Sequence, residues 1–483
     1  MNTGKIYKIV GLSLVALMVA SCSKYFEVNP DMRTELNTAD KVGQLLVTAY
    51  PMTDHLLFSE TASDNATDKG PGSYANNDIA RGSYYWAELT RTDESYSPNS
   101  YWLDMYRIIA AANHAIEAVD DNSAAFGAKG QHYKGEALIT RAYAHHMLVS
   151  LFSKAYQING DNSSYGIPYI TMPEKNAFQD YDRGTVASVY ENIEKDLVEG
   201  MKLIKGIVYK QSKFHFNEKA ANAFAARFYL FKGEYDKVIQ YSSAVFPENN
   251  FKQNIRPVAG SWKAVGNPNQ LFVSATAPYN LLLANVGTKF MGSSASNRYG
   301  GAKALTDMIT AVNVTSGRFY QYLTSIGGDP EKPQLNKYIL SPQGTSTQVL
   351  FSADEVLINR AEAYTQTDQF ELALKDLNDF AEVRIVDYKV ASHQITEQKV
   401  LSFYNTNDLK AGLIQTVLDF RQKAFAHEGF RWFDINRHGL EIEHKHYDSN
   451  MQMTVDILKK DDLRRVFQLP TSTALSGLPK NPR

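Results

Sequence analysis

The sequence predicts a mainly α protein, in which tetratricopeptide-like helical pairs form a scaffold that long irregular loop insertions interrupt, with few short strands. Over several long segments apolar residues recur every three or four positions, which is typical of helices that bury one face. Between these segments, residues 58–100 and 247–348 show no sustained period and are rich in Asn, Ser and Gly. Short strands such as "QLFVSAT", residues 270–276, are expected in the second insertion.

The first helices follow from caps and spacing. Thr38 or Asp40 can cap a short helix that Pro51 ends. Residues 100–120 and 133–155 then each carry apolar positions along one side, and the alanines of the second segment permit a close approach. We expect these two segments to form an antiparallel helical pair.

An internal repeat relates residues 217–246 to residues 354–380. At a fixed offset, Ala226, Tyr229, Tyr235 and Val238 fall on Ala361, Tyr364, Phe370 and Ala373. The pattern resembles the tetratricopeptide helix-turn-helix, with "KGEYD" and "TDQFE" at the turns. Two copies are fewer than such arrays need, so we expect the other helical pairs to belong to the same stack.

Charge and composition narrow the classes of partner. The chain of 483 residues has 50 basic and 52 acidic residues, a formal net charge of -2, and no long basic run. A nucleic acid is therefore not an expected partner. The chain also has 29 Tyr, 24 Phe and 4 Trp, and tyrosine combines an apolar face with a polar tip that suits binding surfaces.

The N-terminus predicts export. Lys5 and Lys8 precede an apolar run that ends in "VASC", which indicates a secretory signal peptide over residues 1–21 rather than a membrane span. Cys22 is the only cysteine, so no disulfide can form within the chain. The quartet resembles a bacterial lipobox, which implies lipidation of Cys22; several acyl chains would then anchor the protein. The alternative is an ordinary cleaved signal followed by a chance cysteine.

Catalytic and metal-binding motifs are scarce. The sequence has no HExxH, GxSxG or Walker A motif in a suitable context. "EIEHKH", with His444 and His446, is a weak metal candidate, and a solvated tail to a helix is the preferred interpretation. Neither a metal nor a cofactor is expected. Asp64, Asp68 and Glu88 leave open a glycosidase, which needs two carboxylates across a cleft.

The stretch "HEGFRWFDINRHG", residues 427–439, places Glu428, Arg431, Asp434 and Arg437 at intervals of three. If the segment is helical, these charges alternate in sign along one side and can neutralise each other. Buried charges are costly unless they are paired, so we interpret the stretch as a structural network and not as an active site.

These pieces together resemble the SusD/RagB family of outer-membrane nutrient-binding lipoproteins. The matching segments are "CSKYFEVNP", "YWLDMYRIIAAANHAI", "GEALITRAYAHHMLVSLFSKA", "ADEVLINRAEAYTQTDQFELALKDLNDFAEVR" and "HEGFRWFDINRHG". "FRWFDINR" lies close to the family pattern of glutamate, two residues, arginine, tryptophan, one residue and aspartate. The C-terminal "VFQLPTSTALSGLPKNPR" departs from the family, because Leu-Pro stands where Ile-Pro is usual.

The resemblance implies one SusD-like domain over residues 22–483, lipid-anchored at the cell surface on the outer membrane. It implies docking over a SusC-like TonB-dependent barrel, capture of an oligosaccharide without catalysis, and delivery to that transporter. Peptide capture by a RagB-like protein is the alternative within binding. A tetratricopeptide-type assembly scaffold and a lipoprotein glycosidase remain as other classes.

Ligand-binding residues are expected in the two insertions, where aromatic rings stand beside polar residues that can bond sugar hydroxyls. Trp102 and Trp432 are assigned to the core instead. The candidates are Asp64, Asn65, Arg81, Tyr84, Tyr85, Trp86, Trp262, Tyr279, Arg298 and Tyr299.

Overall fold

The computed structural model describes residues 35–72, 77–89, 95–174, 179–265, 268–290, 297–325, 335–338, 341 and 344–483. Helices dominate these residues, and their strands pair only as two-stranded antiparallel sheets. The mainly α class is therefore confirmed. Within the same ranges no helix combines the length and the apolar character that a membrane crossing requires. The predicted signal peptide and Cys22 lie outside the described residues and stay predictions.

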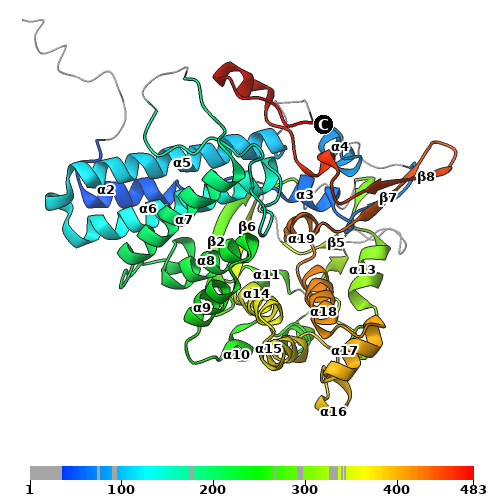
Figure 1. The fold of residues 1–483 in the computed structure, drawn as a ribbon. Coiled ribbons are helices and arrows are strands. Elements are labelled where there is room, and N and C mark those ends of the chain that lie inside the picture. The colour runs from blue at the N-terminus through cyan, green and yellow to red at the C-terminus, as the bar shows by residue number, and fades with distance from the viewer. Residues whose placement is uncertain are drawn as a thin grey trace, which may run out of the picture.

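One short and three long helices make the N-terminal layer (Figure 1): α2 (Ala39–Val47), α5 (Pro98–Asp121), α6 (Ser123–Phe152) and α7 (Val186–Leu203). α6 packs against both α5 and α7, so the predicted pair is confirmed. The Thr38 side chain accepts a hydrogen bond from the Lys41 N–H and caps α2, as expected.

α6 and α7 touch backbone to backbone. A Cβ atom on Gly135 would lie 2.9 Å from the Gly200 carbonyl oxygen, and one on Gly200 would lie 2.8 Å from that of Gly135. Across the same interface Arg141 donates two hydrogen bonds of 2.7 Å to Asp196. Glycine permits the approach, and the bidentate ion pair fixes the register of the two helices.

The internal repeat is present as two helical pairs: α8 (Glu218–Lys232) with α9 (Tyr235–Val245), and α14 (Ala353–Gln366) with α15 (Phe370–Glu382). At the first turn Gly233 has φ 79°, and at the second Asp368 has φ 59°. α14 packs against both helices of the first pair and against α18 (Leu409–Ala424), so the tetratricopeptide-like prediction is confirmed.

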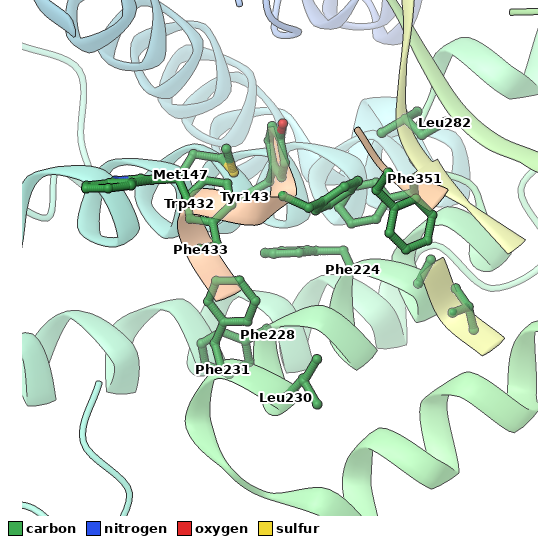
Figure 2. Packing of buried hydrophobic residues seen from close by; sticks show 14 of the residues in the cluster. Tyr143, Met147, Phe224, Phe228, Leu230, Phe231, Leu282, Phe351, Trp432 and Phe433 are labelled. Carbon is green, nitrogen blue, oxygen red and sulfur yellow. The ribbon is translucent and has the colours of Figure 1, made fainter. Parts of the chain in front are cut away.

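The core lies where these pairs meet the C-terminal helix α19 (Phe430–His438). Figure 2 shows aromatic rings from α6, α8 and α19 gathered at this point. The labelled residues are Tyr143, Met147, Phe224, Phe228, Leu230, Phe231, Leu282, Phe351, Trp432 and Phe433. Trp432 is 1% exposed and Trp102 5%, so their assignment to the core is correct.

The insertions contain more secondary structure than expected. The first holds α3 (Leu56–Ala62), β1 (Thr67–Asp68) and α4 (Asp78–Tyr84). The second holds α10 (Phe251–Asn254), η2 (Ser261–Ala264), α11 (Asn269–Phe272), β2 (Asn280–Gly287), β3 (Tyr299–Gly300), α13 (Lys303–Thr310), β4 (Thr324–Ser325), β5 (Leu335–Asn336) and β6 (Thr345–Ser352). η1 (Ser212–Phe214) precedes α8.

The strand expected at residues 270–276 is wrong. Pro268 stands at the N-cap of α11, where its fixed φ favours a helical turn, and the chain turns again after Phe272. The strand comes later, as β2, which pairs antiparallel with β6. Most residues of β2 are buried, so its sequence "NLLLANVG" lacks the alternation that marks a half-exposed strand.

The C-terminal part continues with α16 (Val390–His393), α17 (Glu397–Tyr404), α18 and α19, and then the hairpin of β7 (Ile442–Tyr447) and β8 (Met453–Leu458). η3 (Leu463–Arg465) and η4 (Thr471–Ser476) follow. The solvated tail expected for "EIEHKH" is wrong, because this segment is β7 and alternates buried and exposed residues. The chain ends beside α4 (Figure 1).

Residues 421–437 do not form one continuous helix. α18 ends at Ala424 and α19 begins at Phe430. Gly429 between them has φ 77°, and a Cβ there would lie 2.4 Å from the ring of His55. A glycine is therefore required at this turn, and Glu428 lies before the helix instead of on it.

The expected pairing within this stretch holds only for Asp434 and Arg437, 2.9 Å apart. Asp434 also binds Arg421 at 2.8 Å, and both of these side chains are 1% exposed. The other charges bind side chains from elsewhere: Glu428 binds Arg256 and Lys337, Arg431 binds Asp64, and Arg437 binds Glu362. The charges thus join α19 to the surrounding elements, which is architecture as expected but by a different set of pairs.

Candidate ligand-binding site

A surface hollow of about 500 Å³ lies on α4 and the turn after it, and we call it the α4 depression. It is lined by Asp78, Ile79, Arg81, Gly82, Tyr85, Ala87, Glu88 and Leu89. Arg81 and Tyr85 are two of the ten predicted ligand-binding residues. The Arg81 guanidinium lies 5.8 Å from the centre of the Tyr85 ring, so the hollow combines a cationic donor with a half-buried aromatic ring.

Local contacts hold α4 in place. The Asn77 side chain caps the helix by accepting a bond of 2.9 Å from the Ala80 N–H. After the helix, Trp86 has φ 47°, which is unusual for a bulky residue. Its indole Nε1 donates a bond of 2.8 Å to the Ala62 carbonyl at the end of α3, and this bond holds the turn.

Two histidines of β7 form the layer beneath the α4 depression. The His444 ring stacks between Tyr84, at 4.0 Å, and Trp86, at 4.3 Å. The His446 ring stacks on Tyr85 at 4.1 Å. Sequence reasoning missed both roles, although the spacing of two between the histidines of "IEHKHY" is the signal of side chains on one face of a strand.

His444 bonds only to carbonyl oxygens, to Tyr84 through Nδ1 at 2.7 Å and to Ser63 through Nε2 at 3.0 Å. Carbonyl oxygens accept and do not donate, so both bonds form together only when the ring is protonated. Burial opposes that charge and lowers the pKa of His444, while the two carbonyls oppose the shift. The stack therefore joins α3, α4 and β7 through one ring.

A second clamp ties this layer to the other insertion. Arg298 donates two bonds to Asp68, of 2.6 and 2.8 Å, and a third to the Tyr447 carbonyl. Burial opposes the charge of Asp68, yet Arg298 holds the pKa of its carboxyl below its usual value. The Tyr84 hydroxyl accepts a bond from the Asp68 N–H and donates one to the Lys445 carbonyl.

The structure thus brings one group of the predicted residues together. The group consists of Tyr84, Tyr85, Trp86, Arg298 and Tyr299, and Arg298 is the residue that binds Asp68. The Tyr299 ring lies 5.0 Å from Tyr84 and 5.9 Å from Tyr85. In this group Tyr84, Trp86 and Tyr299 are at most 4% exposed, so their rings pack against protein in the structure.

The remaining predicted residues have other partners. Asp64 accepts two bonds of 2.7 Å from Arg431, and the Asn65 amide donates to Glu60. Trp262 and Tyr279 form a separate cluster around Phe272, at ring distances of 4.7 Å from Trp262 to Phe272 and 5.6 Å from Trp262 to Tyr279. Trp262 is 3% exposed and Tyr279 7%. These rings are not available for stacking without a rearrangement.

The three carboxylates considered for hydrolysis are each bound to a different cation, Asp64 to Arg431, Asp68 to Arg298 and Glu88 to Lys480. The last pair, at 2.8 Å, joins the rim of the depression to the C-terminal tail. Among the residues that the structure describes, no group of three or more His, Cys, Asp and Glu could hold a metal ion.

Comparisons with known proteins agree with this architecture. Residues 24–230 match a family model described as starch-binding associating with outer membrane, and residues 240–471 match the SusD family. No curated protein sequence matches the chain.

Solved structures share the fold at low identity. A SusD superfamily protein from Bacteroides thetaiotaomicron is 20% identical with a TM-score of 0.70, over 92% of this chain and all of that one. A SusD-like carbohydrate-binding protein from Bacteroides vulgatus is 17% identical with a TM-score of 0.64, over 91% and 96%. A laminarin-binding SusD-like protein is 16% identical with a TM-score of 0.62, over 92% and 98%. With two family models that together run from residue 24 to residue 471, this chain belongs to the SusD/RagB family.

Proposed function

We propose that this protein is a surface-anchored lipoprotein that captures oligosaccharides and delivers them to a SusC-like TonB-dependent transporter of the outer membrane. Membership of the SusD/RagB family is the observation that carries the proposal. A starch-binding description of the family and a laminarin-binding neighbour of the same fold support a glycan over a peptide. The same membership supports the predicted Cys22 lipid anchor and the SusC-like partner.

We place ligand capture in the α4 depression. Arg81 is exposed and can donate to sugar hydroxyls, and Tyr85 offers ring surface beside it. The less exposed members of the predicted set act from below: the buried Trp86 and Tyr84 hold His444, and the half-buried Arg298 holds Asp68. In this proposal the buried residues set the shape of the hollow, and the exposed ones touch the sugar.

The proposal includes no catalysis. A glycosidase needs one carboxylic acid that donates a proton and one carboxylate that acts on the opposite side of the bond. Asp64 and Asp68 each accept two hydrogen bonds from an arginine, so their oxygens are already engaged. Although burial opposes the charge of Asp68, Arg298 lowers the pKa of this carboxyl, which opposes a role as proton donor. Incubation with polysaccharides should therefore release no shorter products.

Calorimetry on the chain without residues 1–22 tests capture. The titrants are a panel of neutral glycans that includes laminarin, and pools of peptides. We expect at least one glycan to bind, and Arg81→Ala or Tyr85→Ala to weaken that binding about tenfold or more, since contacts of this kind contribute roughly 1.5–3 kcal/mol.

The matched control is Phe403→Ala, which removes an exposed aromatic side chain from α17 and should leave affinity unchanged. If only peptides bind, the proposed ligand class changes from a glycan to a peptide. Equal affinity of wild type, Arg81→Ala and Tyr85→Ala would move the site away from the α4 depression.

Anchoring and delivery have separate tests. Cys22→Ser should move the protein from the membrane fraction to the soluble exported fraction, because the acyl chains would be lost. A SusC-like barrel encoded beside this protein should copurify with the wild-type chain in detergent. Persistence of Cys22→Ser in the membrane, or purification of that barrel without this chain, would contradict the respective part of the proposal.

A further inference from the structure

A second hollow surface lies between the segment that follows α6 and the C-terminal stretch. It consists of two depressions of about 440 and 290 Å³ that share Lys154, Leu463 and Val466, and we call their union the tail groove. The volumes reach the lower range of natural small-ligand sites. No predicted binding residue lies in its lining.

The smaller depression has a rigid aromatic wall. Tyr165 is 49% exposed, and its backbone pairs with Thr185 in a β-bridge. Hydrogen bonds on either side, from the Val186 N–H to the Ser164 carbonyl and from the Gly166 N–H to the Gly184 carbonyl, fix the segment to the start of α7. An exposed ring on a fixed backbone is a suitable platform for the apolar face of a sugar.

Beneath this wall lies a buried cation. Arg183 is 1% exposed, and its guanidinium lies 5.2 Å from the centre of the Tyr165 ring. It donates only to neutral oxygens, the carbonyls of Gly166, Phe152 and Pro479 and the Asn481 side chain. In the described part of the chain no carboxylate forms an ion pair with it, so its positive charge is offset only by dipoles.

The lining adds further positive charge. Lys154 is exposed, lines both depressions, and has no ion pair among the residues that the structure describes. Arg465, also in the lining, is 8% exposed and donates to four backbone carbonyls. Of the two lining carboxylates, Asp462 is already bound to Arg464, and Asp461 is the other.

The carboxylate of Asp161 would repel an anion bound in the smaller depression. Asp161 accepts bonds from the backbone N–H and the hydroxyl of Ser163, which is part of the lining. It lies at the exposed rim, where solvent screens it, whereas Arg183 is buried and screened much less. The field in the groove is therefore positive on balance.

We propose that the tail groove binds an acidic saccharide, with a sugar ring against Tyr165 and its carboxylate or sulfate group on Lys154. This inference rests on the proposed function, because it assumes that the chain captures glycans. It adds a ligand class, because Lys154 in the tail groove has no ion pair in the described structure, whereas Arg81 in the α4 depression shares its lining with the carboxylates of Asp78 and Glu88. The two surfaces would hold different parts of one polymer or two different chains.

The test is calorimetry on the chain without residues 1–22, with tetragalacturonate and its fully methyl-esterified form as a matched pair. A sulfated carrageenan tetrasaccharide distinguishes sulfate from carboxylate. We expect an acidic probe to bind at least about tenfold more tightly than the neutral ester, because a charge-assisted hydrogen bond is formed. The preference should fall between 50 and 300 mM NaCl as salt screens the contact.

Two variants locate the site. Lys154→Met should reduce the preference for the acid over the ester about tenfold while leaving affinity for the ester unchanged, and Tyr165→Ser should weaken both. Lys375→Met on α15 is the control, because it removes another exposed lysine and should change neither. Lys154 and Tyr165 are exposed enough that both variants should keep the wild-type circular dichroism and melting temperature.

The outcomes separate this inference from the proposed function. Equal affinity for acid and ester, no binding of any acidic probe, or an unchanged preference in Lys154→Met would overturn the tail groove. Acid binding that is lost in Arg81→Ala but kept in Lys154→Met would assign the acid to the α4 depression and overturn it as well. Acid binding that depends on Lys154, without any neutral glycan binding, would support the groove and remove the α4 proposal.

Discussion

The charged cluster around α19 and the α4 depression are built from the same residue types but have different roles. Around α19, Arg421 and Asp434 are each 1% exposed, and Arg256 and Glu428 have side chains 1% and 2% exposed. In the α4 depression, Arg81 is exposed and Glu88 binds Lys480 at the surface. Arginine, aspartate and aromatic residues are therefore not a signature of function by themselves.

The difference is whether the hydrogen-bonding groups are already used. Arg437 donates to both Glu362 and Asp434, and although burial opposes the charge of Glu362, Arg437 holds the pKa of that carboxyl well below its usual range. A group whose donors all have internal partners cannot offer them to a ligand. Arg81 has only a ring contact in the described structure, so its donors face solvent.

The dependence of the unfolding free energy on pH is the broadest test of the difference between the buried scaffold and the surface. Burial lowers the pKa to about 3 in four histidines, His55, His145, His146 and His427. In the unfolded chain these imidazoles take up protons near pH 6.5. Their contribution to the unfolding free energy is therefore fully present above that pH and is lost as pH drops toward 3. At pH 5 each ring should cost roughly 2 kcal/mol. Burial raises the pKa of Asp54 to about 6, which opposes the loss with one group.

Urea unfolding at pH 7.5, 6.5 and 5.5 measures this loss. The control is His146→Phe, because the His146 ring lies among Phe224, Phe228 and Phe231 and a phenyl ring can take its place. In that variant the unfolding free energy should decline less steeply with falling pH, by the contribution of one histidine. An unfolding free energy that does not change with pH would mean that the buried rings take up protons as readily in the folded as in the unfolded chain.

Asp434→Ala should destabilise the protein by about 3–5 kcal/mol, because Arg421 and Arg437 lose a buried anionic partner. Urea unfolding at pH 7.5 measures the change. Asp379→Ala, which breaks the exposed pair with Lys375, should cost less than about 0.5 kcal/mol. Similar losses in the two variants would show that burial of the α19 cluster does not matter energetically.

Trp86→Phe should cost about 1–2 kcal/mol, since the indole bond to the Ala62 carbonyl is lost and the stack on His444 shrinks. Thermal unfolding and glycan titration together decide the role of this ring. Unchanged stability combined with lost affinity would place Trp86 against the ligand, in contrast to its burial in the structure.

Glu88→Gln should have the smallest effect, below about 0.5 kcal/mol in unfolding free energy, because the Lys480 pair is largely exposed. If the α4 depression binds glycan, affinity should change more than stability does. A large loss of stability would show that the C-terminal tail depends on this bond, and the contrast between the two regions would weaken.

The scaffold could be predicted because its signals are local. Helical spacing, the Thr38 cap and each copy of the repeat, around Ala226 and around Ala361, lie within short windows of sequence. The position of Trp86 could not be predicted, because its burial depends on His444, more than 350 residues later. An aromatic residue in a polar segment looks like a ligand platform until its partner is known.

The same reason explains the errors around α19. The intervals of three between Glu428, Arg431, Asp434 and Arg437 indicated pairing along one helix side, but Gly429 breaks the helix first. The actual partners, such as Asp64 for Arg431, are distant in sequence and carry no local signal. The pair of Asp434 with Arg437 and the conclusion that the charges are structural are what the pattern predicted correctly.

Arg183 also has a consequence for the order of folding. Its guanidinium bonds to Pro479 and Asn481, almost 300 residues later, at the last turn of the chain. These two bonds form only when the C-terminal stretch packs against the segment between α6 and α7, and contacts of such long range slow folding. A chain shortened by its last five residues would leave this guanidinium without two acceptors. The C-terminal tail thus completes the hydrogen bonds of a buried guanidinium that lies far away in the sequence.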